Sequence, residues 1–240
     1  MNTYEGPKAD KIQNMFSVVA KNYDRTNTVL SGGIHHLWRK AAVKFTGAKA
    51  GDSVLDCATG TGDLAIEFAK TVGKSAKVVG TDFCQPMLDL APAKAEAAGF
   101  EIPFQWADVM DLPMEDNEFD ISSISFGIRN VQDPVKGLSE LARVTKPGGT
   151  VLVIEFGQMQ NPVMGPLYGF YSNKILPKLG GMVSGQSDAY QYLQDSSAKF
   201  PCRDEFLGMM NSTGLFDQTT LEFKPLTFGV AYMYKGTVQK

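Results

Sequence analysis

Cysteine, histidine and basic charge are scarce in this sequence of 240 residues. The three cysteines, Cys57, Cys84 and Cys202, form an odd set without C-x-x-C spacing, so we expect neither a disulfide framework nor a metal site. Acidic residues outnumber lysine and arginine by 26 to 23, and the formal net charge is −3. This balance disfavours a nucleic-acid partner, which would require a basic face.

Long apolar runs are missing as well. No stretch approaches the roughly 18–20 residues of a membrane span, and the polar beginning MNTYEGPKADKIQNMF does not look like a signal peptide. Internal repeats and low-complexity tracts are absent too. We therefore expect a cytoplasmic globular protein with residues 1–240 in a single domain.

What the sequence does contain, between residues 50 and 156, is an alternation of strand-like and helix-like segments. The strand-like segments are apolar throughout, at about 53–58, 77–83, 103–108, 119–127 and 150–156. Helix-like segments separate them, at 62–70, 86–99 and from Pro134 to the Pro-Gly-Gly at 147–149, with Asp133 as the N-cap. Strands that are apolar on both faces and alternate with helices predict an α/β fold with a mainly parallel sheet.

The two flanks of this cofactor-binding core (49–156) differ from it. Residues 1–48 look helical and are dense in aromatic and polar side chains, and we expect them to form a lid. Residues 157–200 are broken by glycine and proline, and we expect a substrate cap there. The rest of the segment 157–240 predicts a helix at about 202–213 and an antiparallel hairpin, with strands at 215–223 and 226–234, that closes the sheet.

The segment VLDCATGTGDLA joins the first strand to the first helix. Gly60 and Gly62 allow a tight turn and a close approach to a ligand, although such glycines also serve packing alone. The second strand ends in Asp82, twenty residues after Gly62, where a carboxylate can accept both hydroxyls of a ribose. Together these features predict a nucleoside-type ligand.

The glycine spacing fits NAD, but four details favour S-adenosylmethionine. Asp56 places an acid beside the turn, which suits an ammonium and would repel a pyrophosphate. Asp108 ends the third strand, in position for an adenine amino group. The helix, Pro-Gly-Gly turn and strand of 134–156, and the closing hairpin, are typical of methyltransferases. We therefore expect the Rossmann-like class I fold of S-adenosylmethionine-dependent methyltransferases.

Several segments are similar to one enzyme family, across nearly the whole chain: YDRTNTVLSGGIHHLWR, LDCATGTGDLA, VVGTDFCQPML, SFGIRNV, RVTKPGG and YLQDSSAKFP. The sequence resembles the ubiquinone/menaquinone biosynthesis C-methyltransferase family. This resemblance implies methyl transfer to a ring carbon of a polyprenyl hydroquinone, such as demethylmenaquinol or a benzoquinol of ubiquinone synthesis. By motif, it also implies cofactor contacts by Thr61, Asp82, Asp108, Val109 and Ser125. The chain departs from the family pattern at Tyr234, where histidine is usual, and at Ser197.

The segment SFGIRNV suggests the catalytic chemistry. A ring hydroxyl titrates near 10, to judge by tyrosine, so the reactive phenolate needs help at pH 7. Arg129 stays protonated and can hold that oxyanion beyond a strand's carboxyl end, and Asn130 can orient the other ring oxygen. In the alternative interpretation, Arg129 only pairs with Asp133 or Glu155.

The general base is open between several groups of the expected lid. Tyr23, Asp24, His35 and His36 all lie there, and a water relayed to one of them would also serve. We name Tyr23 and His35 as candidates, since histidine titrates near pH 7. Each of these residues could instead belong to packing or to the helix surface.

A polyprenyl tail requires lipid or an apolar groove. Segment 161–183 mixes aromatic residues, methionine and leucine with two lysines, which suits transient contact with the inner face of the cytoplasmic membrane. An ordinary cap or a homodimer surface would have the same composition.

Three rival functions share parts of this pattern. An NAD-dependent oxidoreductase would use the same glycine turn, and a regulatory subunit would bind a nucleoside without catalysis. A small-molecule O- or N-methyltransferase is the nearest competitor, and SFGIRNV is the main reason to rank it lower.

Overall fold

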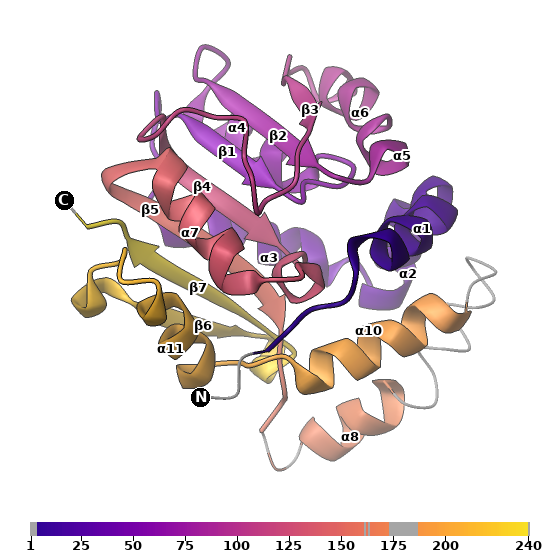
Figure 1. Cartoon of the computed structure of the whole chain (residues 1–240). Coiled ribbons are helices and arrows are strands. Elements are labelled where there is room, and N and C mark those ends of the chain that lie inside the picture. The colour runs from indigo at the N-terminus through magenta and orange to yellow at the C-terminus, as the bar shows by residue number, and fades with distance from the viewer. Residues whose placement is uncertain (1–3, 161, 163, 173–186, 240) are drawn as a thin grey trace.

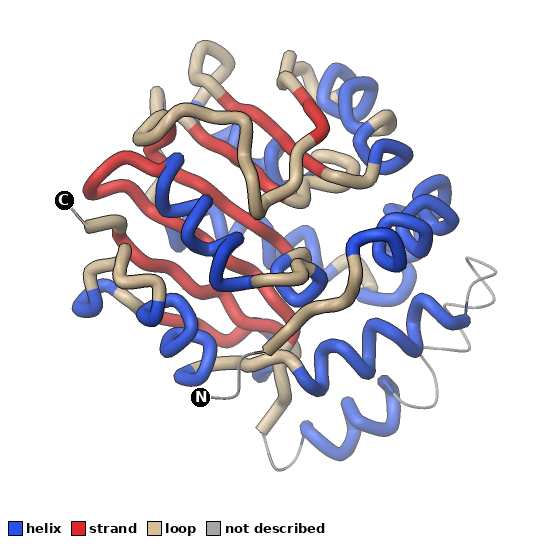
Figure 2. The backbone as a smooth tube through the Cα atoms, viewed as in Figure 1, coloured by secondary structure: helices blue, strands red, loops and turns tan. Residues whose placement is uncertain are grey.

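The computed structural model describes residues 4–160, 162, 164–172 and 187–239. A seven-stranded sheet crosses the molecule in the order β3-β2-β1-β4-β5-β7-β6 (Figures 1 and 2). The first five of these strands pair in parallel, whereas β5, β7 and β6 pair antiparallel. The mainly parallel α/β sheet with an antiparallel carboxyl-terminal pair is thus confirmed. The strands are β1 (Val54–Cys57), β2 (Val78–Asp82), β3 (Phe104–Trp106), β4 (Phe119–Ser125), β5 (Thr145–Phe156), β6 (Glu222–Leu226) and β7 (Ala231–Thr237).

Helices lie along both faces of the sheet. In the described part of the chain the α-helices are α1 (Ala9–Val19), α2 (Tyr23–Ser31), α3 (Ile34–Thr46), α4 (Asp63–Val72), α5 (Gln85–Leu88), α6 (Ala91–Ala97), α7 (Pro134–Val144), α8 (Met164–Phe170), α10 (Ser187–Lys199) and α11 (Asp204–Ser212). Short 3-10 turns join some of them, at η1 (Ala20–Asn22), η2 (Ile128–Asn130), η4 (Gln218–Thr220) and η5 (Thr227–Gly229).

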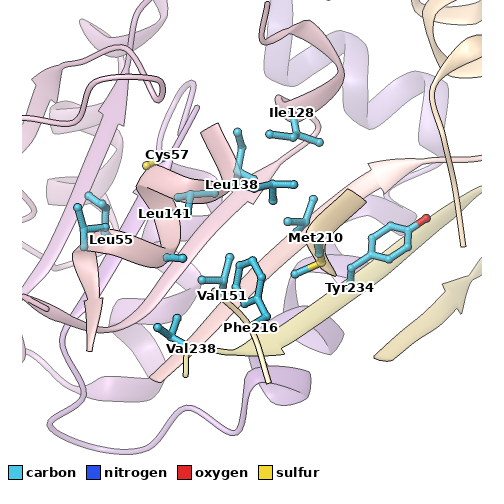
Figure 3. Close-up of a cluster of buried hydrophobic side chains, with 14 of the residues drawn as sticks. Leu55, Cys57, Ile128, Leu138, Leu141, Val151, Met210, Phe216, Tyr234 and Val238 are labelled. Atoms are coloured by element: carbon cyan, nitrogen blue, oxygen red, sulfur yellow. The ribbon is translucent and has the colours of Figure 1, made fainter. Parts of the chain in front are cut away.

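Alternate residues of each strand face opposite sides, so the sheet has two apolar cores. On one face, Leu55 and Val151 pack in a cluster with Leu138 of α7 and Met210 of α11 (Figure 3). On the other face, α3 and α4 cover the sheet, and Leu152 belongs to the same buried cluster as their side chains. This burial holds the carboxyl ends of the parallel strands at one edge.

The expected lid divides into two parts. Helix α3 is a core helix, because its Trp38, Ala42 and Val43 are buried in the second cluster. The helices α1 and α2 lie at the carboxyl edge of the sheet. There, Phe16 and Tyr23 pack against Cys84 and Met87. Within the expected lid, α1 and α2 therefore cover the strand ends, whereas much of α3 belongs to the core. The division of the chain at residues 48 and 156 stays a prediction.

Several element boundaries differ from the sequence-based expectation. The expected helix 86–99 is two helices, α5 and α6. Asp133 does cap α7, accepting a hydrogen bond from the Lys136 amide at 3.0 Å. That helix ends at Val144, however, because Thr145 is already extended and pairs with Phe119 of β4. The Pro-Gly-Gly at 147–149 therefore lies within β5.

The closing strands are shifted towards the carboxyl terminus. Phe216, expected within the first strand, is instead buried in the core beside α11 and makes an isolated bridge to Val238. β6 begins at Glu222, and the turn to β7 is Thr227–Gly229. The cap is more helical than expected, with α8 and α10; residues 173–186, which include much of the proposed membrane segment 161–183, lie outside the described residues.

The sheet order locates a binding crevice. β2 lies on one side of β1 and β4 on the other, so the chain reverses its direction of travel across the sheet between β1 and β4. Ligands of open α/β sheets bind at such a reversal, beyond the carboxyl ends of the strands. The glycine turn after β1 and the SFGIRNV segment after β4 both lie at this place.

Candidate active site

The turn between β1 and α4 has a backbone that requires glycine. Gly60 and Gly62 have φ angles of +57° and +83°. A Cβ atom on Gly62 would lie 2.9 Å from Phe104 Cζ and 3.2 Å from Ala91 Cβ. Gly62 therefore serves both conformation and packing, while the Gly60 amide points to the end of β2.

Asp82, at the end of β2, is fixed by that amide. Its Oδ2 accepts a hydrogen bond from the Gly60 amide and its Oδ1 from the Cys84 amide, both at 2.8 Å. The carboxyl group is largely buried, and burial raises its pKa despite these bonds. Each oxygen retains a lone pair, so the group can still accept ribose hydroxyls.

Asp56, at the end of β1, is held by two hydroxyl groups. Ser123 Oγ donates to its Oδ1 and Thr59 Oγ1 to its Oδ2, each at 2.7 Å. Burial raises the pKa of Asp56 to about 6, and the hydrogen bonds counteract only part of that effect. A cationic ligand group beside it would stabilise the ionised form.

A narrow cavity of about 90 Å³ lies beside Asp82. Asp108 lines it, with its Oδ1 accepting a hydrogen bond from the Met110 amide at 2.9 Å. Helix α1 covers it with Ile12 and Phe16. Further predicted site residues border the same cavity: Gly60, Val109, Ser125 and Asn130. The structure therefore brings together most of the residues expected to hold a nucleoside.

A second cavity of about 880 Å³ adjoins the first. It is lined by α2 and α3, by the carboxyl ends of β1, β4 and β5, and by α8 and α10. Both cavities share the residues Phe16, Tyr23, Ala58, Gly60, Ser125 and Phe126. Two ligands could therefore lie end to end and meet at this junction.

Arg129 lines the larger cavity and forms a buried ion pair. Its Nη1 lies 2.6 Å from Glu155 Oε1 and also donates to the Phe126 carbonyl at 2.7 Å. The side chains of Arg129 and Glu155 are 5% and 1% exposed. Within the described part of the chain, its buried Nε has no hydrogen-bond partner. The pairing with Glu155 is thus present, and it engages the Nη1 group of the guanidinium.

Asn130 is placed differently from Arg129. It lines the narrow cavity, and its Oδ1 accepts a hydrogen bond from Tyr192 of α10 at 2.8 Å. The hydroxyl of Tyr4 donates to the Arg129 carbonyl at 2.8 Å. The Arg-Asn turn is therefore held from the cap and from the amino-terminal segment, and neither tyrosine contact was expected from the sequence.

The two candidate bases lie on the larger cavity, and neither titrates near pH 7. Burial, together with the charge of Arg39, lowers the pKa of His35 to about 4, and its Nδ1 lies 2.6 Å from Ser31 Oγ. Burial raises the pKa of Tyr23. At neutral pH His35 is therefore uncharged and Tyr23 is a protonated donor, which differs from the expected role of His35.

Thr61, expected at the cofactor, lines the larger cavity but has other partners. Its hydroxyl donates to Asp24 Oδ1 at 2.7 Å and accepts from Lys94 Nζ at 3.0 Å. Sequence reasoning missed Lys94, as well as the aromatic wall of the larger cavity formed by Trp38, Phe126 and Phe156. Of these residues, only Phe126 could have been singled out from the sequence, because it lies inside the segment SFGIRNV.

Comparison with solved structures places this fold in a class. A solved structure from Thermotoga maritima, described as a methyltransferase dependent on S-adenosylmethionine and a possible histamine N-methyltransferase, matches with a TM-score of 0.64 at 20% identity. The match covers 93% of this chain and 98% of that one. The fold is that of these methyltransferases.

The family follows from the sequence comparisons. The model of the ubiE/COQ5 methyltransferase family matches residues 5–238, and the chain belongs to this family. The ubiquinone/menaquinone biosynthesis C-methyltransferase UbiE of Bdellovibrio bacteriovorus is 63% identical, over 97% of this chain and 98% of the relative. The demethylmenaquinone methyltransferase of Thermus thermophilus is 43% identical, over 92% and 99%. The resemblance seen in the sequence is confirmed, and the comparisons decide against an NAD-dependent oxidoreductase.

The low pKa of His35 predicts that the stability of the folded protein depends on pH. The unfolded chain protonates this histidine below about 6.5, whereas the folded protein resists protonation until about pH 4. Stability is therefore lost as the pH falls between these values. We expect the wild type to lose about 2 kcal/mol relative to His35→Gln between pH 7 and pH 4, measured by urea unfolding. His36→Gln is the control, and a pH-independent difference between wild type and His35→Gln would contradict the burial effect.

Proposed function

We propose that the protein transfers a methyl group from S-adenosylmethionine to a ring carbon of a polyprenyl hydroquinone. The acceptor is demethylmenaquinol, the benzoquinol of ubiquinone synthesis, or both, in keeping with the names of the two relatives. One observation carries the proposal: a narrow cavity bordered by acidic strand ends opens into a large cavity that contains Arg129.

The residues present fit the donor. Asp82 would accept the ribose hydroxyls and Asp108 the adenine amino group, with Val109 and Ser125 beside the ring. Asp56 would attract the ammonium, and the backbone of Gly60, Thr61 and Gly62 would approach the amino-acid part. S-adenosylmethionine supplies a methyl group on a sulfonium centre, which is already electrophilic. The protein must therefore supply alignment, an electron-rich acceptor and exclusion of water.

The acceptor side would be prepared by Arg129. Loss of a ring-hydroxyl proton makes the neighbouring carbon nucleophilic, and a guanidinium beside the oxygen stabilises the resulting anion. The N–H groups of the guanidinium other than those of Nη1 would be the donors for this contact. Asn130 lines the narrow cavity, so it would orient the other ring oxygen from that side, and its bond to Tyr192 holds the amide in place.

Removal of the ring-hydroxyl proton would involve side chains of the lid. His35 is uncharged at neutral pH and lines the acceptor cavity, so it can receive a proton directly or through water, although its low pKa makes it a weak base. Tyr23 borders both cavities and would donate a hydrogen bond at the place where donor and acceptor meet. The reaction forms a carbon–carbon bond, releases the donor as a thioether, and releases one proton from the acceptor.

The experiment that tests this function is a product analysis. The protein is incubated with methyl-labelled S-adenosylmethionine and either demethylmenaquinol or the benzoquinol, each with a short prenyl chain. We expect incorporation of one methyl group on a ring carbon, measured by mass spectrometry. A product methylated on oxygen would refute the proposal, and so would the absence of product with both quinols.

The division of roles predicts opposite effects for two variants. Arg129→Ala should lower turnover by at least about 100-fold, since the oxyanion loses its donor, while affinity for S-adenosylmethionine stays nearly unchanged. Asp82→Ala should weaken that affinity. Because Arg129→Ala leaves Glu155 buried without its partner, a double variant, Arg129→Gln with Glu155→Gln, controls for lost stability. Equilibrium dialysis and initial rates measure both effects, and lost cofactor binding on replacing Arg129 would move it out of the acceptor site.

The prenyl tail leads us to propose transient contact with a membrane surface. No helix among the described residues is long and apolar enough to cross a bilayer. Residues 1–48 carry seven lysines and arginines against three acids, whereas the rest of the chain carries 16 against 23. Val18, Val29 and Leu37 are at least half exposed on the helices of this segment, and Val29 also lines the larger cavity. A basic segment with exposed apolar side chains fits an anionic bilayer.

We therefore expect the protein to sediment with vesicles that contain phosphatidylglycerol more than with neutral phosphatidylcholine vesicles. Replacing Val18 and Leu37 together by serine should weaken this binding severalfold, because their apolar area no longer enters the bilayer. The matched control replaces Leu90 and Leu215, which are exposed on other parts of the chain. Equal sedimentation of both double variants would contradict a docking role for the basic segment.

A further inference from the structure

We propose that Lys94 is a positioning residue that couples the lid over the acceptor cavity to the glycine turn of the cofactor site. Lys94 belongs to α6, a helix to which neither the sequence nor the family resemblance assigns a functional residue. The identity of the two ligands rests on the proposed function. The network around Lys94 is independent of that identity.

Lys94 connects three parts of the chain. Its Nζ lies 2.5 Å from Asp24 Oδ2, 2.6 Å from Asp63 Oδ1 and 3.0 Å from Thr61 Oγ1. An ammonium has three N–H donors, and these three oxygens match them. Asp24 lies in α2 of the lid, Thr61 lies in the glycine turn, and Asp63 is the first residue of α4. One side chain thus binds the lid, the turn and the helix that follows it.

Two further contacts close the network. Thr61 Oγ1 donates to Asp24 Oδ1 at 2.7 Å, so the lid also contacts the turn directly. Arg39 of α3 pairs with Asp63 Oδ2 at 2.7 Å. Although burial acts to raise it, the charges of Arg39 and Lys94 hold the pKa of Asp63 below its usual value. Helices α2 and α3 are therefore each fastened to the segment 61–63 by a charged contact.

The network is accessible to solvent. The side chains of Asp24 and Lys94 are 42% and 29% exposed, whereas those of Asp63 and Arg39 are 21% and 15% exposed. Partly exposed ion pairs are weaker than buried ones and are partly screened by salt. They can therefore open and close, unlike the buried pair of Arg129 and Glu155, which suits a reversible fastening.

The positions of these contacts lead to coupling between the ligands. Asp24 directly follows Tyr23, which borders both cavities, so a displaced α2 would also displace the junction between them. Thr61 lines the larger cavity and directly follows Gly60, which borders both cavities. A ligand that orders this turn lowers the free-energy cost of closing the lid, and a closed lid favours binding of the acceptor. Such coupling is reciprocal between the two ligands.

The coupling can be measured as a ratio of affinities. The affinity for a short-chain demethylmenaquinol is determined with and without S-adenosylhomocysteine in the wild type, in Lys94→Met and in Lys94→Arg. We expect S-adenosylhomocysteine to tighten acceptor binding about tenfold in the wild type and hardly at all in Lys94→Met. Lys94→Arg, which keeps the charge, should recover part of the effect. Lys70→Met, which removes an exposed pair with Glu67 on α4, should behave as the wild type.

A second measurement needs no acceptor. Lys21 and Arg25 are exposed trypsin sites that flank Asp24. Without ligand, we expect trypsin to cut there about fivefold faster in Lys94→Met than in Lys70→Met, since only the former releases the lid. High salt should remove the difference, because it opens the network in both proteins. Failure of the quinol assay would leave this result unaffected, so the two proposals are tested separately.

Two outcomes would overturn the role of Lys94. One is that S-adenosylhomocysteine tightens acceptor binding in Lys94→Met as much as in the wild type. The other is that trypsin cleaves Lys94→Met and Lys70→Met at the same rate. Circular dichroism verifies that each variant folds. If Lys94→Met does not fold, Asp24→Asn tests the same contact from the lid, and unchanged cleavage and coupling in that variant would equally exclude the network.

Discussion

The larger cavity of this molecule depends on one buried ion pair, between Arg129 and Glu155. Removing both charges from water costs several kcal/mol per ion, and only close contact with additional hydrogen bonds compensates that cost. Arg129 obtains these from Glu155 and from the Phe126 carbonyl, and its guanidinium lies 5.4 Å from the centroid of the Phe156 ring. The turn after β4 and the end of β5 must therefore form together. The large cavity, whose wall includes both segments, follows from that requirement.

Charged side chains lie on both sides of the junction between the two cavities. Asp82 and Asp108 border the narrow cavity, whereas Arg129 and the buried Asp56 line the larger one. A donor with positive groups and an acceptor that becomes anionic would each meet the opposite sign. Because these charges are held by hydrogen bonds before any ligand arrives, little reorganisation is left for the reaction itself. The proposed C-methylation draws on this arrangement more than on a strong general base.

The sequence predicted those parts of the site whose geometry depends on the spacing of nearby residues along the chain. Gly60, Gly62 and Asp82 form one strand-turn-helix unit and the end of the next strand, so their meeting follows from the alternation of elements. Contacts between distant segments were not predictable in this way. Tyr192 reaches Asn130 across 62 residues, and Lys94 reaches Asp24 across 70. The low pKa of His35 and the inward position of Phe216 likewise depend on packing that no local pattern encodes.

Phe126 shows what the junction between the cavities demands of the backbone. It has a φ of +56°, a conformation that favours glycine, and its ring stacks near Phe156 with centroids 4.5 Å apart. A non-glycine residue held in such a conformation costs on the order of 1 kcal/mol or more. Glycine would relax the main chain here, but it would also remove a ring that lines both cavities. The strained backbone at Phe126 therefore persists because its ring, packed on Phe156, shapes the wall that the two binding spaces have in common.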